Sequence, residues 1–160
     1  VVYYSASGST AKVAEYIKNA ANADIFELEP TDKYSDADLN WTDSSSRVNA
    51  EHEDESKRDI KLKSTTVPNW EDYDAVLIGY PIWWHTAPMI IGTFLESYDL
   101  TGIDVYPFTQ SASMDRTQFN NSMEFVRECA NGATVHDGLF ARYSDTSAIT
   151  AYLNNNNLIK

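Results

Sequence analysis

The sequence predicts an α/β fold with a parallel sheet. Strand-like segments alternate with segments of helical periodicity along most of the 160 residues. One apolar run, residues 75–78, contains no polar residue, which is typical of a strand covered on both faces. Alternating strands and helices form crossovers that leave neighbouring strands parallel. The length fits a single domain over residues 1–160.

Each predicted element has a local reason. Ser9 or Thr10 can cap the first helix, and Pro88 suits the first turn of the second. Pro107 is unfavourable within its strand but tolerable there. The predicted strands cover residues 1–4, 24–29 near an edge, 75–78, 103–109 and part of 133–143, which holds one last strand or a bent pair. The predicted helices cover residues 9–21, a segment beginning at 88, 117–130 and 146–153.

Residues 30–70 interrupt this alternation. The segment is long and polar, and residues 51–55 read Glu-His-Glu-Asp-Glu. Such a composition is typical of a solvated, partly helical connection, and the alternative is a lid or a partner surface. Near the other end, the four asparagines at 154–157 predict a frayed end of the last helix.

Composition excludes several classes of function. Acidic residues outnumber Lys and Arg by 24 to 12, which disfavours binding to nucleic acid or to an anionic membrane. No apolar run approaches the roughly 20 residues that span a bilayer. Cys129 is the only cysteine, so the chain forms no internal disulfide and no cysteine metal cluster, and we expect a buried, inert thiol. We expect His52 and His136 to face solvent, without metal-ligand spacing.

The N-terminal residues bear on the cellular compartment of the protein. No signal peptide is visible, which favours a cytoplasmic protein over an exported one. The chain begins at Val1 without an initiator Met, so a removed leader and a trimmed chain are both alternatives.

The loop after the first strand predicts a phosphate site. It reads Ser5-Ala6-Ser7-Gly8-Ser9-Thr10 and lies between strand and helix, beyond the carboxyl end of the strand, where open α/β sheets bind ligands. Its backbone N–H groups favour an anion, and its hydroxyls can donate to phosphate oxygens. The loop lacks both the Gly-Lys-Ser/Thr element of a Walker loop and the three glycines of the dinucleotide fingerprint. The alternative is a serine-rich capped turn.

The second loop predicts a site for a planar ligand. Residues 79–88 read Gly-Tyr-Pro-Ile-Trp-Trp-His-Thr-Ala-Pro and follow the most apolar strand. Adjacent side chains point in different directions, so we expect at least one of Trp83 and Trp84 near the surface, where it can stack on such a ligand. The alternative places one Trp in the core and the other against a neighbouring helix.

The third loop is small and polar. It reads Gln110-Ser111-Ala112-Ser113-Met114-Asp115 and follows the strand predicted at 103–109. Short side chains let a loop approach the edge of a ligand closely.

With these loops the sequence resembles flavodoxin-type proteins. The first loop has the family's hydroxyl-x-hydroxyl-Gly-x-hydroxyl form at Ser5, Ser7, Gly8 and Thr10, and residues 79–88 are similar to a bacterial branch of the family. The resemblance covers nearly the whole chain in element order. It implies a flavodoxin-like three-layer open sandwich, with a five-stranded parallel sheet of order 2-1-3-4-5 and FMN at its edge, for which flavodoxin is the type example.

Carried over residue by residue, the resemblance implies an FMN site in three parts. The phosphate would be held by Ser5, Ala6, Ser7, Gly8, Ser9 and Thr10. The isoalloxazine ring would be lined by Tyr80, Pro81, Ile82, Trp83, Trp84 and His85, with one Trp stacking and with His85 either hydrogen-bonding the flavin or purely structural. The ring's other edge would meet Gln110, Ser111, Ala112 and Ser113.

The third loop departs from the family's pattern. Related proteins often place glycines or a second stacking aromatic there, and residues 109–115 contain neither. We therefore expect one flavin face to be open, or to be covered by another chain or by a residue of the segment 30–70 such as Trp41.

The resemblance implies an FMN-binding redox protein in which the flavin performs the chemistry and no side chain is catalytic. The acidity, with no Lys or Arg from 64 to 115, favours an electron carrier steered toward a basic partner. An open ring face favours the alternative, an NAD(P)H:quinone-type reductase. A non-redox module for another phosphate ligand is the third possibility. The expected partner is a redox protein or a small electron acceptor, and the chain is a monomer or a homodimer.

Overall fold

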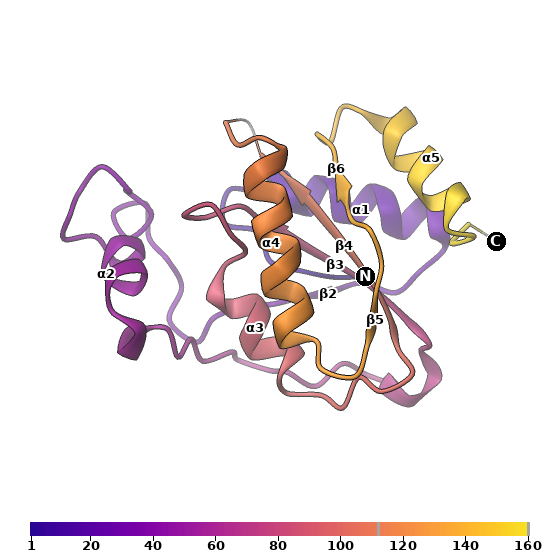
Figure 1. Cartoon of the computed structure of the whole chain (residues 1–160), viewed down its shortest axis with the longest axis horizontal. Coiled ribbons are helices and arrows are strands. Elements are labelled where there is room, and N and C mark those ends of the chain that lie inside the picture. The colour runs from indigo at the N-terminus through magenta and orange to yellow at the C-terminus, as the bar shows by residue number, and fades with distance from the viewer. Residues whose placement is uncertain (112, 160) are drawn as a thin grey trace.

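Helices cover both faces of one sheet in a computed structural model that describes residues 1–111 and 113–159. Figure 1 shows α3 and α4 on one side of the sheet and α1 and α5 on the other. The strands are β1 (Val2–Tyr3), β2 (Phe26–Glu27), β3 (Ala75–Pro81), β4 (Asp104–Gln110), β5 (Thr134–Val135) and β6 (Leu139–Phe140). The helices are α1 (Ser9–Ala21), α2 (Arg47–Glu53), α3 (Met89–Leu95), α4 (Arg116–Cys129) and α5 (Thr146–Asn155), with 3-10 turns at Glu55–Lys57 and Trp70–Asp72.

The sheet has the order β2-β1-β3-β4-β5, and all of its strand pairs are parallel. β6 also pairs with β4, so the fifth strand position is divided between two short strands. β5 lies beside the first half of β4 (Val105↔Val135) and β6 beside the second half (Phe108↔Leu139). The predicted fold class and strand order are confirmed, and the last strand is a bent pair.

The two central strands are buried on both faces, which explains their unbroken apolar runs. On β3, Val76, Ile78 and Tyr80 pack toward α3 and α4, whereas Leu77 packs toward α1 and α5. This alternation follows from the two-residue period of a strand. On β4, Phe108 is fully buried on the α1 and α5 side. The core therefore fixes β3 and β4 rigidly at the centre of the molecule.

Two helix ends differ from prediction. Gly8, with a φ of 87°, is the N-cap of α1 and no side chain caps this helix, so Ser9 and Thr10 are its first helical residues instead of its caps. Asn154 and Asn155 belong to α5, and a turn closes the helix after them: Asn157 has a φ of 57°, and the N–H of Leu158 donates to the carbonyl of Leu153 at 2.9 Å. Asparagine tolerates this left-handed conformation, so the helix ends in an ordered turn.

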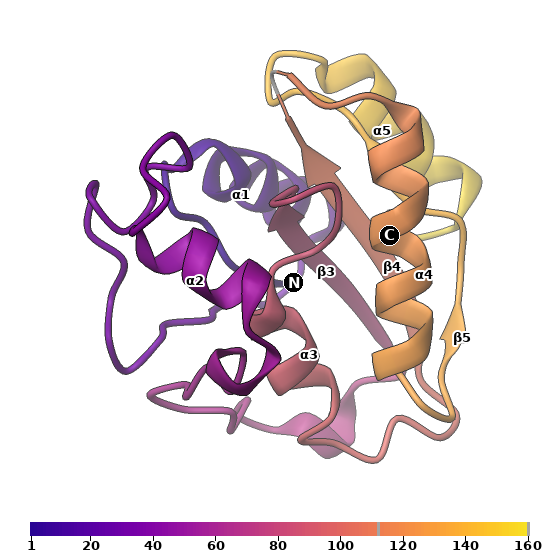
Figure 2. The ribbon, with the colours of Figure 1, turned by 60° about the vertical axis from the view of Figure 1, so that its left-hand side comes forward.

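Residues 30–63, called the insert below, form a closed excursion that carries α2. Its base is held by backbone bonds from Thr31 N to Lys61 O (2.8 Å) and from Lys63 N to Glu29 O (2.9 Å). Val48 and Ile60 are buried, so the insert has its own apolar contacts and is more than a solvated connection. Figure 2 shows α2 beside the loop that follows β3.

Candidate functional site

The three predicted loops leave the same edge of the sheet. Tyr3 of β1 pairs with Gly79 of β3, and Pro81 at the end of β3 pairs with Gln110 at the end of β4. Because these strands are adjacent and parallel, the loops that follow them begin side by side (Figure 2). The structure therefore brings together residues 5–10, 80–85 and 110–113, of which Ala112 lies outside the described residues.

The first loop forms an open turn at the start of α1. Gly8 takes up the left-handed conformation, and a Cβ placed on it would meet no atom within 4 Å. The N–H of Gly8 donates to Ser5 Oγ at 3.1 Å, which fixes the turn, while Ala6 and Ser7 are exposed. The first-turn N–H groups of a helix have no intrahelical acceptor, so this concavity suits an anion. Thr10 is buried beneath the loop, which leaves Ser7 as the exposed hydroxyl.

A cation lies one turn into the helix. Lys12 Nζ stands 4.7 Å above the centre of the Tyr143 ring, and Lys12 N donates to Gly8 O at 3.2 Å. Tyr143 belongs to the turn between β6 and α5, which sequence reasoning did not place at the site. The turn after a parallel last strand lies at the same edge of the sheet as the other loops. A prediction that ended this strand at residue 140 would therefore have placed Tyr143 at the site.

The second loop contains a tight two-residue turn. Trp83 N donates to Thr86 O at 2.9 Å, and Thr86 N donates to Trp83 O at 3.0 Å. The central residues, Trp84 and His85, have φ values of 47° and 65°. Turns of this kind favour Asn-Gly or Gly-Gly, so a Trp-His pair stores strain that its surroundings must hold. Strain of this kind is concentrated at functional sites.

The two tryptophans point in different directions, and both are half-buried. The Trp83 ring lies edge-on to Tyr4 (centroids 5.5 Å apart, planes at 90°) and to Tyr34 (5.2 Å, 74°). The Trp84 ring is stacked on His52 of α2 (4.4 Å, 10°). Trp83 is therefore an anchor between β1 and the insert, and Trp84 has one face covered by an imidazole.

His52 faces solvent, as expected, but it has a second role that the sequence did not indicate. The residue as a whole is exposed, but its ring covers Trp84. Its place within a run of acidic residues hides this contact, because polarity alone does not show where a helix packs. Trp41, suggested as a cover for the flavin, is instead 70% exposed. Among the described residues, Tyr34 and His52 are the insert's aromatic contacts to the second loop.

A hydrogen-bond network holds the insert's contact surface together. Glu51 accepts from Tyr34 Oη and from Arg47 Nε, both at 2.7 Å. The Arg47 guanidinium also lies 4.0 Å above the Tyr34 ring. Burial and the bond to Glu51 raise the pKa of Tyr34, so its hydroxyl stays protonated as a donor. Between the insert and the second loop lies a cavity of about 210 Å³, lined by Tyr34, Val48, Glu51, His52, Arg58, Trp83, Trp84, Thr86, Ala87, Pro88 and Met89.

The third loop is held at both ends. Thr109 Oγ1 donates to the carbonyl of Tyr80, which ties β4 to β3, and the N–H of Met114 donates to Ser111 Oγ at 3.0 Å. Gln110 and Ser111 are half-buried, and Ser113 is exposed. A cavity of about 370 Å³ adjoins this loop, lined by Ser111, Met114, Phe140, Ala141, Arg142, Ser144 and Asp145.

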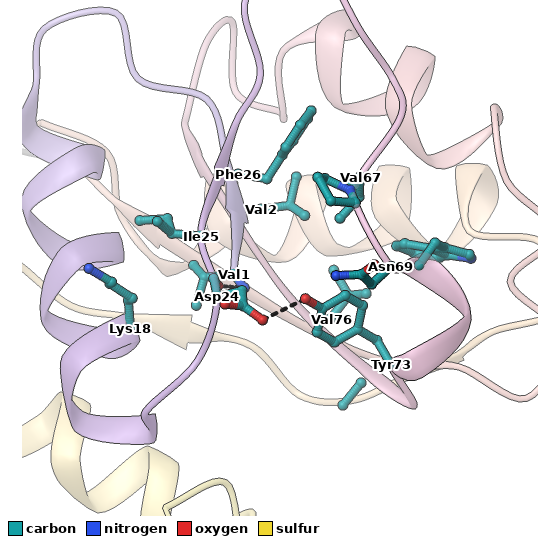
Figure 3. A pocket seen from close by; sticks show the side chains of 13 residues that line it. Val1, Val2, Lys18, Asp24, Ile25, Phe26, Val67, Asn69, Tyr73 and Val76 are labelled. Carbon is teal, nitrogen blue, oxygen red and sulfur yellow. Dashed lines mark hydrogen bonds between the residues drawn. The ribbon is translucent and has the colours of Figure 1, made fainter.

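Another cavity, of about 350 Å³, lies at the opposite edge of the sheet (Figure 3). It opens beside the beginnings of β1 and β3, where Tyr73 Oη donates to Asp24 Oδ2 at 2.6 Å. Its walls include Phe26 and Trp70. The described residues of the three loops do not line it, so it is separate from the predicted site.

Cys129 and His136 lie outside the three loops, and both pack against neighbouring residues. Cys129 is buried, as expected, and burial together with the nearby Glu96 raises the pKa of its thiol to about 12. His136 was expected to face solvent but is half-buried, stacked on Tyr106 (4.3 Å, 4°), with Nε2 2.7 Å from Asp104 Oδ1. Over residues 1–111 and 113–159, no group of three His, Cys, Asp or Glu side chains is placed to hold a metal. Among the helices that the structure describes, every one is too short or too polar to cross a membrane.

Comparison with known proteins points to one family. The family described as Flavodoxin matches residues 1–156. A Bacteroides eggerthii DSM 20697 structure named as a flavoprotein is 36% identical, with a TM-score of 0.85 over 96% of this chain and 94% of that one. One from Bacteroides uniformis ATCC 8492, named likewise, is 33% identical, with a TM-score of 0.85 over 96% and 95% of the two chains. A Lactobacillus acidophilus NCFM flavoprotein in complex with FMN is 25% identical, with a TM-score of 0.66 over 91% and 93%. No curated protein matches the chain.

Proposed function

Because this chain belongs to the flavodoxin family, we propose that it is an FMN-binding electron carrier. The observation that carries the proposal is that a glycine turn at the start of α1, suited to an anion, and a tryptophan loop leave the same edge of the sheet. The relative from Lactobacillus acidophilus, which was solved as an FMN complex, supports the choice of cofactor.

The first loop fits the phosphate of FMN. Gly8 opens the turn, Ser5 fixes it, and the start of α1 directs backbone N–H groups at the concavity. Ser7, Ser9 and the backbone of the loop would hold the phosphate oxygens. The loop has no basic residue, so hydrogen bonds and the helix dipole supply the binding, with Lys12 as the nearby positive charge.

The second and third loops fit the ring. Trp84 would stack on the isoalloxazine, since Trp83 already packs edge-on against two other rings. Tyr80 is fully buried and supports the loop from below, where its hydroxyl lies 3.1 Å from Ser122 Oγ. Gln110, Ser111 and Ser113 would face the ring's other edge.

When bound, FMN supplies the electron chemistry, and the protein supplies binding, orientation and electrostatics. The described side chains at this edge would bind the flavin and orient it. We assign no catalytic acid or base among them. A net charge of −12, with no Lys or Arg in residues 64–115, favours docking to a basic redox partner.

One observation favours a second function, an FMN-dependent NAD(P)H:quinone-type reductase. The cavity of about 370 Å³ beside the third loop carries Arg142, a cation suited to an anionic nucleotide, and Met114 and Phe140, which suit a flat acceptor. A substrate at that position would lie next to the proposed ring edge.

Anaerobic titration separates the two functions. The FMN-loaded protein is mixed with NADH and then NADPH, the flavin spectrum is followed, and a quinone is added. A carrier is reduced only slowly without a separate reductase. Rapid direct reduction, followed by turnover on the quinone, replaces the carrier with the reductase.

A further inference from the structure

His52 lies outside the three loops and yet contacts the proposed ring site. Its imidazole is stacked almost parallel to the Trp84 indole, with 10° between the ring planes and 4.4 Å between the centroids. Aromatic pairs of this kind restrict the orientation of both rings. His52 therefore limits where the indole of Trp84 can lie.

The backbone of Trp84 needs such external support. The residue occupies the left-handed region at a φ of 47°, followed by His85 at 65°. The two backbone bonds between Trp83 and Thr86 close the turn but leave the side-chain torsions of Trp84 free. The orientation of the indole is then decided by what packs against it.

His52 is itself on a fixed support. Arg58 Nε donates to the Glu51 carbonyl at 2.8 Å, and Arg58 Nη2 donates to the His52 carbonyl, so the last carbonyls of α2 are capped by a guanidinium. Glu51, the preceding residue, is buried and held by Tyr34 and Arg47. Tyr34 in turn packs against Trp83, so residues of the insert contact both tryptophans.

We propose that His52 is a positioning residue for the flavin: it covers one face of Trp84 and thereby presents the opposite face to the isoalloxazine ring. The inference rests on the proposed function, since it presupposes FMN at this edge. It gives the insert a role, which is to preorganise the second loop before the flavin binds.

FMN titration of four apoproteins tests this proposal. The proteins are the wild type, His52→Ala, His52→Phe and, as a control from the same insert, Trp41→Ala, whose indole is 70% exposed. Quenching of flavin fluorescence gives Kd, visible circular dichroism reports the asymmetry around the ring, and thermal unfolding of each apoprotein reports the fold.

We expect His52→Ala to raise Kd about threefold to tenfold, the worth of one aromatic stack, and to change the circular dichroism of the bound flavin. His52→Phe keeps a flat ring, so it restores both quantities, and Trp41→Ala leaves both at the wild-type value. The proposal is overturned if His52→Ala binds FMN as the wild type does, if His52→Phe is as weak as His52→Ala, or if Trp41→Ala is equally weak. A wild-type protein that binds no FMN overturns the proposed function as well, whereas the other failures overturn this inference alone.

Discussion

Gly79 and Phe108 lie opposite one another on β3 and β4, and the Phe108 ring occupies the space of a side chain at position 79. A Cβ built on Gly79 would lie 2.1 Å from Phe108 Cζ, closer than any real contact. Phe108 is fully buried, so it has no room to move away. The glycine that opens the motif at 79–88 is therefore required by packing at the base of the second loop.

We expect Gly79→Ala to lower the free energy of unfolding by about 1–3 kcal/mol, the usual cost of overpacking a core. Urea denaturation of the apoprotein measures this quantity. Leucine is smaller than phenylalanine and has no ring, so adding Phe108→Leu to the Gly79→Ala protein should recover part of the lost free energy of unfolding. The single variant Phe108→Leu is the control for the double variant. A Gly79→Ala protein as stable as the wild type would show that the two residues are not in contact.

The two tryptophans should separate into one structural and one binding residue. Trp83→Ala removes the ring that lies between Tyr4 and Tyr34, so we expect it to destabilise the apoprotein by about 2 kcal/mol. Trp84→Ala should change stability less and raise the Kd for FMN about tenfold through lost stacking. Thermal unfolding and flavin titration of both variants test the assignment. The reverse pattern, or no effect of either variant on FMN affinity, would remove the second loop from the ring site.

The first loop should recognise the phosphate and nothing else of the ligand. Ser7→Ala deletes an exposed hydroxyl, and a hydrogen bond to a charged group contributes about 1.5–3 kcal/mol. We therefore expect FMN affinity to fall about tenfold to a hundredfold, whereas riboflavin, which lacks the phosphate, should bind the variant and the wild type equally. Parallel titrations with the two flavins make the measurement. Equal losses for FMN and riboflavin would place the phosphate elsewhere.

Cys129 should be protected from thiol reagents in the folded protein. Burial, with Glu96 nearby, raises the pKa of the thiol from 9.0 to about 12, so the reactive thiolate is scarce at pH 8. The folded state holds this proton more tightly than the unfolded chain. Its contribution to stability is therefore complete below pH 9 and is lost as the pH rises toward 12. Labelling at pH 8 should be slow for the native protein and fast in urea, and equal rates would contradict the burial.

The sequence alone predicts that the three loops lie at one edge of the sheet, but it does not predict which residues of the insert pack against them. The apolar run at 75–78 and the alternation of elements predict β3 at the centre of a parallel sheet, and parallel strands place their following loops at one edge. The contact between His52 and Trp84 joins positions 32 apart in the chain and depends on how a polar insert folds back. Local periodicity carries no signal for such a contact.

The sequence predicts either one last strand or a bent pair at residues 133–143, and it could not decide between the two for a related reason. Thr134–Val135 and Leu139–Phe140 are both short, and their pairing with β4 is a property of the whole sheet. The cap of α1 was assigned to Ser9 or Thr10 by residue preference, whereas the turn at Gly8 is set by its left-handed backbone.

Flavin binding by the apoprotein tests the central claim most directly. Protein stripped of ligand is titrated with FMN while flavin fluorescence is followed, and the loaded protein is then denatured to identify the released chromophore. We expect a yellow protein that binds one FMN per chain and releases it intact on unfolding. A colourless protein that leaves the fluorescence of added FMN unchanged would contradict it.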